Sequence, residues 1–195
     1  MDYEGVKKLV FNKLKHGLSD DLRYHSPQHT QDVLEAAIRL AQMEGINGND
    51  LELLKTAVVF HDLGFIISYK QHEKESVKLA KEILPKYGYS IDDIDKIEGM
   101  IMSTEIPQKP SNKLEEIIAD ADLDYLGRDD IFLISQRLQY EWKQLGIVTT
   151  LRDWHEKQLQ FMKNHDYHTE SAKKLRREKK LKNIEELEIL LCLKK

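Results

Sequence analysis

The stretch Ala57-Val58-Val59-Phe60-His61-Asp62-Leu63-Gly64 places a histidine and an aspartate directly after four apolar residues. In a helix, His61 lies four residues after Ala57 and Asp62 lies four after Val58, so both polar side chains continue apolar rows. Burying a carboxylate in apolar surroundings is costly unless another group compensates its charge. We therefore expect a buried helix whose last turn carries His61 and Asp62 to a polar site inside the fold.

Two other segments combine the same residue types with helical apolar spacing. His29 precedes an apolar row that includes Val33 and Leu40, so its side chain points inward from the first turn of a helix. Asp122 shares a helical face with Ile118, which directs this carboxylate toward the interior as well. The alternative for each residue alone is a separate partner, such as a backbone group for a histidine or an arginine for an aspartate. Together, the three segments indicate one shared polar site.

Apolar residues recur with a helical period in nearly every part of the chain. Ser26 followed by Pro27 is typical of a helix N-cap with proline at the first helical position, and Ser90 with Asp93 has the spacing of a capping box. No alternating run is long enough to argue for a strand. We expect eight or nine helices, roughly over residues 2–16, 27–44, 50–62, 71–86, 91–104, 112–126, 130–145, 150–164 and 168–191. The sequence therefore predicts an all-α fold, a compact bundle of many helices.

The composition favours an ordered chain without disulfides. Of the 195 residues 41% are hydrophobic, enough to bury a core, and 9 Gly and 4 Pro exclude collagen-like and low-complexity classes. The single cysteine, Cys192, excludes an internal disulfide. The net charge of −4 gives no electrostatic case for nucleic acid or an anionic membrane, and the basic run 173–182 reads as a solvated helix because glutamates interrupt or follow it. With no signal peptide or membrane-spanning run visible, we expect a cytoplasmic protein.

Two imidazoles and two carboxylates can be satisfied at once by a divalent cation. Mixed nitrogen and oxygen ligands suit Mn, Mg, Fe, Co, Ni or Zn ions, whereas a closed structural zinc site more often uses cysteine. Four protein ligands on an octahedral ion leave positions for water and substrate. The candidate ligands are His29, His61, Asp62 and Asp122. This donor set is typical of a hydrolytic centre.

The pattern His29…His61-Asp62…Asp122 resembles the H…HD…D signature of the HD-domain superfamily of metal-dependent phosphohydrolases. The resemblance covers roughly residues 20 to 130 and implies an all-helical fold in which these four residues bind the metal. Asp120 also follows an alanine, as the last ligand of this family does, and is the reserve candidate for that position. We expect residues 1–195 to form a single domain of this type, with residues 130–195 packing on or outside its core.

The segment Tyr24-His25-Ser26-Pro27-Gln28-His29 resembles a motif of cyclic nucleotide phosphodiesterases, which belong to the same superfamily. That likeness implies that His25 donates a proton to the leaving oxygen, although Ser26 replaces the asparagine of the motif. His72 matches a further histidine that many HD-domain enzymes use to contact phosphate or a second metal. The alternatives are a helix-entry residue bonded to nearby backbone for His25 and a solvated helix start for His72.

The sequence thus predicts a metal-dependent phosphohydrolase acting on a phosphoester, in particular a nucleotide or cyclic nucleotide. Asp62, besides binding metal, would accept a proton from the attacking water. A non-catalytic module that binds a nucleotide or a partner protein is the main alternative, and a di-iron oxygenase is the third. Lys70, Lys109 and Arg128 are expected to be surface charges and not phosphate ligands. The oligomeric state is open.

Overall fold

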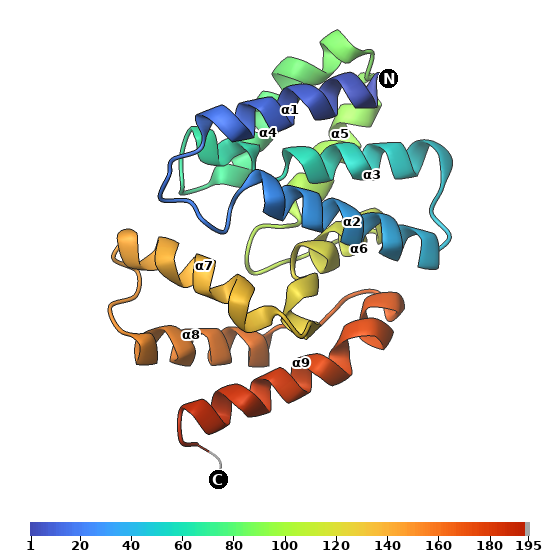
Figure 1. Cartoon of the computed structure of the whole chain (residues 1–195). Helices are drawn as coiled ribbons and strands as arrows, with labels where there is room; N and C mark the ends of the chain where they lie inside the picture. Colours follow the sequence, from blue (N-terminus) through green and yellow to red (C-terminus); the bar gives the residue numbers. More distant parts are fainter. Residues whose placement is uncertain (194–195) are drawn as a thin grey trace. The chain divides into compact units, whose positions relative to one another are not determined.

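The computed structural model describes residues 1–193, and the secondary structure of these residues is helical, with no strand (Figure 1). The prediction of an all-α fold is confirmed. None of the helices within the described range combines the length and the apolar character needed to cross a membrane. The α-helices are α1 (Tyr3–Gly17), α2 (Pro27–Met43), α3 (Gly48–Phe60), α4 (His72–Ile83), α5 (Ile91–Met102), α6 (Lys113–Asp122), α7 (Ile131–Gln144), α8 (Leu151–Asn164) and α9 (Glu170–Leu190). Three 3₁₀ helices lie between them: η1 (Leu63–Ile66), η2 (Leu84–Tyr87) and η3 (Asp124–Gly127).

The contacts group the chain into two compact units. The first unit consists of residues 1–19 and 25–122, and the second consists of residues 20–24 and the chain from Leu123 onward. All four candidate metal ligands belong to the first unit. The expectation that the whole chain forms one domain stays a prediction.

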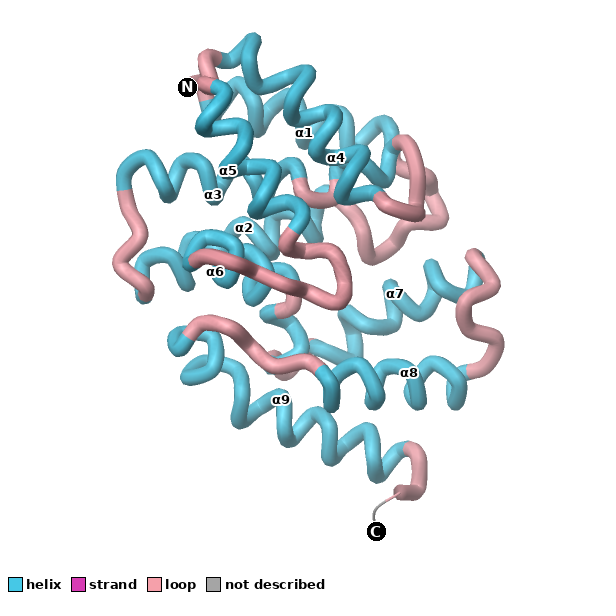
Figure 2. The backbone as a smooth tube through the Cα atoms, turned by 180° about the vertical axis from the view of Figure 1, so that it is seen from behind, coloured by secondary structure: helices cyan, strands magenta, loops and turns pink. Residues whose placement is uncertain are grey.

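The first unit is built around α2 and α3. These two helices pack against each other, α6 packs against α2, and α5 packs against α3. The α5–α6 connection is a loop over residues 103–112 (Figure 2). Leu53, Ala57, Ile97 and Ile117 are fully buried among these helices. The apolar spacing that predicted the helices therefore also forms the core, and it brings the start of α2, the end of α3 and the end of α6 together.

Local capping fixes where the helices of the first unit begin. The Ser26 side chain caps α2 by accepting a hydrogen bond from the His29 backbone NH at 3.3 Å, and Pro27 occupies the first turn. Ser90 and Asp93 form the capping box of α5. Both predictions are confirmed. Because the cap fixes the start of α2 at Pro27, His29 lies in the first turn of the helix, where its side chain is buried.

Several predicted helices end earlier in the structure than expected. The helix expected to run to residue 62 ends at Phe60, the one expected to run to 86 becomes 3₁₀ after Ile83, and the one expected to run to 126 ends at Asp122. At the first of these places the chain must bend because Gly64 lies against α4: a Cβ on Gly64 would stand 1.9 Å from the His72 carbonyl oxygen. Helical period alone does not report such a close approach of two backbones.

The second unit contains η3 and α7 to α9. Its core combines Tyr24 with residues of η3, α7, α8 and α9, namely Leu123, Tyr125, Leu126, Ile131, Leu159, Met162, Ile184, Leu187 and Leu191. A Cβ on Gly127 would meet the Arg176 carbonyl oxygen at 2.4 Å, so η3 and α9 are in backbone contact. The helical period predicts a helix up to residue 126, but it does not reveal this close approach of Gly127 to α9.

The basic run on α9 is not uniformly solvated, contrary to expectation. Arg176 donates two hydrogen bonds to Asp124, at 2.8 and 2.9 Å, and Asp124 is 2% exposed. Lys180 is buried and donates to the His165 carbonyl, and burial lowers the pKa of its ammonium group. Asn183 donates to the carbonyls of Leu126 and Arg128. Arg176 and Asn183 thus satisfy a carboxylate and two carbonyls in and beside η3, and Lys180 satisfies a carbonyl at the end of α8. Charge counting along the helix does not reveal these roles.

Candidate metal centre

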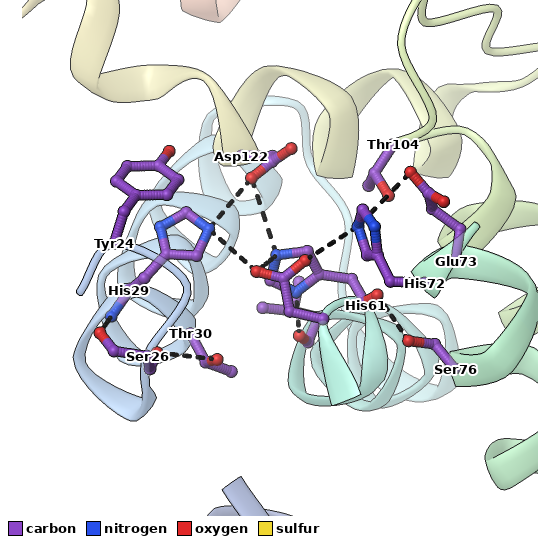
Figure 3. A network of polar contacts seen from close by, with 12 residues as sticks. Tyr24, Ser26, His29, Thr30, His61, His72, Glu73, Ser76, Thr104 and Asp122 are labelled. Atoms are coloured by element: carbon purple, nitrogen blue, oxygen red, sulfur yellow. Dashed lines mark hydrogen bonds and ion pairs between the residues drawn. The ribbon is translucent and has the colours of Figure 1, made fainter. Parts of the chain in front are cut away.

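Three helices bring two imidazoles and one carboxylate to a common point. His29 comes from the first turn of α2, His61 is the C-cap of α3, and Asp122 is the last residue of α6. One potential ligand atom of each residue lies within 4.8 Å of those of the other two. Asp122 Oδ1 is 3.3 Å from His29 Nε2 and 3.6 Å from His61 Nε2 (Figure 3). The structure therefore juxtaposes three of the four predicted ligands around one centre.

Asp62 joins the same group from the turn that follows α3. Its Oδ2 atom is 3.3 Å from His29 Nε2 and 3.2 Å from His61 Nε2. The side chains of Asp62 and His61 are almost fully buried, whereas that of Asp122 is 16% exposed. Both carboxylates thus face the same two imidazoles, and Asp122 lies on the more accessible side.

The ring of His61 is oriented by its own helix. Its Nδ1 atom is 2.7 Å from the Val58 carbonyl oxygen, and because a carbonyl can only accept, Nδ1 carries the hydrogen. In the neutral ring, Nε2 is then the free lone pair and points at the carboxylates. An imidazole whose second nitrogen is tied to a carbonyl is the usual arrangement of a metal-binding histidine.

The turn after α3 is fastened to α4 by Ser76. The Ser76 hydroxyl donates to the His61 carbonyl at 2.8 Å and accepts from the Gly64 NH at 2.7 Å. Ser76 is fully buried, and these two bonds span the residues on either side of Asp62. We call residues 61–64 the His-Asp turn; its geometry is thus set by a side chain twelve residues further on.

The donor set fits a divalent cation. Among the described residues, His61 Nε2 and Asp62 Oδ2 are buried atoms that make no hydrogen bond, although each faces an opposite group. Two carboxylates this deeply buried need a positive charge, which either protonated imidazoles or a cation can supply. Nitrogen and oxygen donors at one point suit Mn²⁺, Fe²⁺, Co²⁺, Ni²⁺, Zn²⁺ or Mg²⁺.

In the absence of a cation, protons take over the compensation. Burial lowers the pKa of His29, but close contacts with the negatively charged Asp122 and Asp62 outweigh it and raise the value to about 9. The same carboxylates raise the pKa of His61 well above its usual range against the effect of burial. For Asp62, burial opposes ionisation, yet attraction to His61 dominates and holds the pKa of this carboxyl well below its usual range. The metal-free site is therefore an imidazolium–carboxylate cluster.

His72 lies at the edge of this cluster as the first residue of α4. Its Nε2 atom is 3.5 Å from Asp62 Oδ1 and 3.4 Å from Glu73 Oε1, and its side chain is 19% exposed. Burial lowers the pKa of His72, but the contact with Asp62 outweighs this and raises it. The alternative of a solvated helix start is wrong, because this ring contacts the candidate ligand.

His25 is partly exposed and reaches the site through ring contacts. Its ring stacks on Phe65 with centroids 4.1 Å apart, and it lies 6.0 Å from the ring of His29 and 6.2 Å from that of His72. The structure therefore brings His25 beside the cluster without making it a member. Whether His25 and His72 act on a substrate stays a prediction.

The structure separates the two candidates for the last aspartate. Asp122 makes the contacts with His29 and His61, while Asp120 is fully buried two residues earlier on α6. Asp124, two residues after Asp122, pairs with Arg176 in the second unit. The choice of Asp122 followed from its apolar face, and the same reasoning had no means of finding the partner of Asp124.

The cationic candidates are not part of the cluster. Lys70 and Lys109 are exposed, as expected. Arg128 is in the second unit and donates to Asp130 at 2.6 and 2.9 Å, so it is an ion-paired side chain and not a plain surface charge.

Sequence reasoning missed the residues that support the cluster. Ser76, Glu73 and Phe65 are buried around the His-Asp turn and His72. A signal for Ser76 was available, since it is a small polar residue on the apolar face of α4 with Val77 and Ala80. Nothing in the chain near Phe65 distinguishes it from an ordinary core phenylalanine.

The all-helical first unit and its two-histidine, two-aspartate cluster define a class of protein. Residues 28–124 match the HD domain family, and these residues contain the four members of the cluster. The chain belongs to the HD-domain superfamily.

Individual relatives are consistent with this assignment. An uncharacterized protein of Clostridium beijerinckii is 30% identical over 101 residues, which are 50% of this chain and 62% of that protein. Two crystal structures, each 20% identical, share the fold: a predicted HD superfamily hydrolase from an uncultured Thermotogales bacterium (TM-score 0.64, covering 95% of this chain and 91% of that one) and a protein of Lactobacillus plantarum (TM-score 0.66, 99% and 98%). YpgQ of Bacillus subtilis, solved in complex with ADP, is also 20% identical (TM-score 0.62, 96% of both chains).

Proposed function

We propose that this protein is a metal-dependent phosphohydrolase. The observation that carries the proposal is the convergence of two imidazoles and two carboxylates inside the first unit. Each Nε2 atom lies 3.2–3.6 Å from an oxygen atom of both carboxylates. Membership of the HD-domain superfamily supports it independently. The proposed metal ligands are His29, His61, Asp62 and Asp122.

In this proposal the protein side chains orient the reaction and move its protons. A divalent ion in the cluster would supply Lewis acidity that polarises a phosphoryl oxygen and makes water a nucleophile at neutral pH. Asp62 offers its Oδ1 atom, on the side of His72, as acceptor for the proton that the attacking water loses. His25 donates a proton to the leaving oxygen, and His72 binds the phosphoryl group.

A nucleotide is the substrate class that we propose. The support is indirect: a structural relative, YpgQ of Bacillus subtilis, was solved with ADP bound. Nucleoside mono-, di- and triphosphates and cyclic nucleotides all present the phosphoester or phosphoanhydride bonds on which such a cluster can act.

The decisive experiment combines metal analysis with turnover. The purified protein is stripped with EDTA, reloaded with Mn²⁺, Mg²⁺, Co²⁺, Ni²⁺, Fe²⁺ or Zn²⁺, and assayed against nucleotides and simple phosphoesters. We expect hydrolysis that needs the metal and is lost in Asp62→Asn, which keeps the size of the side chain but removes its charge. Asp124→Asn is the matched control, because Asp124 is equally buried but pairs with Arg176.

The results separate the candidate functions. Metal binding with hydrolysis lost only in Asp62→Asn supports the phosphohydrolase. A folded protein that binds a nucleotide but hydrolyses no compound with any metal is instead a binding module. Hydrolysis that survives in Asp62→Asn contradicts the assignment of this residue.

A further inference from the structure

Four aromatic rings lie beside the proposed metal ligands in the first unit: His25, Phe65, Tyr69 and His72. Phe65 stacks on His25 with centroids 4.1 Å apart and planes at 29°, and on His72 with centroids 3.8 Å apart and planes at 19°. Tyr69 meets Phe65 edge-on at 5.2 Å. A single phenyl ring therefore contacts both His25 and His72, the two histidines that lie beside the ligand cluster.

The two histidines come from separate segments and share Phe65 as a common support. His25 precedes α2 and His72 begins α4, and their ring centroids are 6.2 Å apart. A ring stacked on an aromatic face keeps its plane, whereas an imidazole without such a neighbour rotates among its rotamers. Phe65 can act as a fixed support because it is only 7% exposed.

Phe65 is itself positioned by the His-Asp turn. It lies in η1, and its backbone NH donates to the Asp62 carbonyl at 3.1 Å. The same short turn thus presents the Asp62 carboxylate to the imidazoles of the cluster, and it is followed directly by the Phe65 ring, which contacts His25 and His72.

We propose that Phe65 is a positioning residue that holds the imidazoles of His25 and His72 in a fixed relation to the metal ligands. It touches neither the proposed metal nor the reacting atoms and acts through the two rings it supports. Its effect on catalysis rests on the function proposed above, while the placement of the rings can be tested without any activity.

The first measurement is NMR of the histidine side chains in the metal-free protein. Phe65→Leu and Phe65→Met remove the aromatic ring at similar volume, and Phe65→Tyr keeps it. Removing the phenyl ring ends its shielding of nearby protons whether or not the imidazoles move, so the measured quantity is the rotamer. From three-bond couplings about χ1, we expect His25 and His72 to average among rotamers in the first two variants and to keep the wild-type rotamer in Phe65→Tyr. Phe161→Leu is the control, since Phe161 also stacks on a histidine, His165, but in the second unit.

The second measurement is kinetic and uses phenyl phosphate and p-nitrophenyl phosphate. Misplacing a proton donor costs about 100-fold, so kcat for phenyl phosphate should fall about 100-fold in Phe65→Leu. The p-nitrophenyl ester should lose much less, because its leaving group needs no proton. Metal affinity should stay within about threefold, whereas KM should rise to a similar extent for both esters, because His72 binds the phosphoryl group that they share. Phe65→Tyr should restore kcat and KM, and a merely structural role would lower kcat equally for both esters.

The outcomes distinguish this inference from the proposed function. If the wild type hydrolyses neither ester nor any nucleotide, the proposed function fails, and the histidine rotamers measured by NMR alone then decide whether Phe65 holds the two rings. If the χ1 couplings of His25 and His72 in the Leu and Met variants coincide with those of the wild type, or if kcat is unchanged in an active enzyme, the inference is wrong.

Discussion

His61 shows how one residue joins structure and chemistry through its two ring nitrogens. Nδ1 is tied to the Val58 carbonyl within its own helix, and Nε2 faces Asp62 and Asp122. The first contact places the proton of the neutral ring on Nδ1, which leaves the Nε2 lone pair available for a metal ion. Burying such a polar ring at the end of an apolar helix costs free energy unless a group of opposite charge lies nearby.

Replacing Asp122 by asparagine should weaken metal binding strongly. Asp122→Asn keeps the shape but removes the charge that two imidazoles face, so we expect a loss of more than about 100-fold in affinity, beyond that seen for groups that only support a ligand. Titration of Mn²⁺ or Co²⁺ in competition with a chelator measures it. Asp120→Asn, two residues earlier and fully buried, is the control and should bind metal as the wild type does. The reverse result would make Asp120 the ligand.

The metal-free protein should lose stability as the pH rises above neutrality. The pKa of His29 is raised from 6.5 to about 9 in the folded state, so the folded state holds its proton more tightly than the unfolded chain. The resulting stabilisation is complete below pH 6.5 and disappears as the pH passes through about 9. Urea midpoints in EDTA between pH 6 and 9.5 should therefore decrease, and less so in His29→Gln.

Added metal should reverse this dependence. Because metal ligands must be deprotonated, the stabilisation by Mn²⁺ should increase with pH over the same range. A metal-free protein whose urea midpoint is constant from pH 6.5 to 9 would contradict the imidazolium–carboxylate cluster.

At the residue scale, sequence could predict the cluster but not its supports. His29, His61 and Asp122 were identifiable because each is polar at a position whose helical neighbours are apolar. Phe65 could not be identified, since an aromatic residue in a core looks the same whether its neighbours are aliphatic or histidines. The buried pair of Asp124 with Arg176 could not be identified either, because the two residues are 52 positions apart in the sequence.

At the scale of elements, the short piece between α3 and α4 constrains the site most. Gly64 lies against the backbone of α4, where a Cβ would stand 1.9 Å from the His72 carbonyl oxygen and 2.7 Å from the Ser76 nitrogen. Neither atom belongs to a flexible side chain that could move aside. The His-Asp turn and the first turn of α4 are therefore interlocked.

Gly64→Ala should destabilise the protein and displace His72. Overpacking against backbone cannot relax locally, so we expect a loss of about 3 kcal/mol in the free energy of unfolding, measured in urea. Gly17→Ala is the control: its Cβ would be 3.2 Å from an Ile66 side-chain carbon, which has room to shift, and the loss should stay below about 1 kcal/mol. Equal losses in the two variants would show that the close approach at Gly64 is not limiting.

The helices themselves were predictable, and their ends only in part. Apolar period and the caps at Ser26 and Ser90 placed α2 and α5 within two residues of their observed bounds. The end of α3 was predicted two residues late, because the contact that ends it lies on α4. Local signals determine a helix start, whereas tertiary contacts decide several of the helix ends.

At the scale of the whole molecule, the two units offer separate spectroscopic signals. Both tryptophans of the chain, Trp142 and Trp154, belong to the second unit and lie with ring centroids 5.5 Å apart. The candidate metal centre belongs to the first unit. Tryptophan fluorescence therefore reports the unit that does not contain the ligands.

Metal should stabilise both units together if the chain is a single domain, as the sequence predicts. At a free metal concentration 100 times the dissociation constant, the gain in unfolding free energy is about 2.7 kcal/mol. We expect the tryptophan transition in urea to shift with metal as far as the loss of helical circular dichroism does. If the urea midpoint of the tryptophan transition is the same with and without metal, the two units are independently folding domains.

The hydrogen bond from the Gly64 amide to the Ser76 hydroxyl makes this amide proton a reporter of the contact between the His-Asp turn and α4. Its protection against exchange with solvent depends on a side chain of another helix and not on the ladder of its own. Any fluctuation that lifts α4 from the His-Asp turn, however brief, exposes this proton while the amides inside α3 stay protected. The exchange rate of the Gly64 amide therefore measures how often α4, and with it His72, separates from the His-Asp turn.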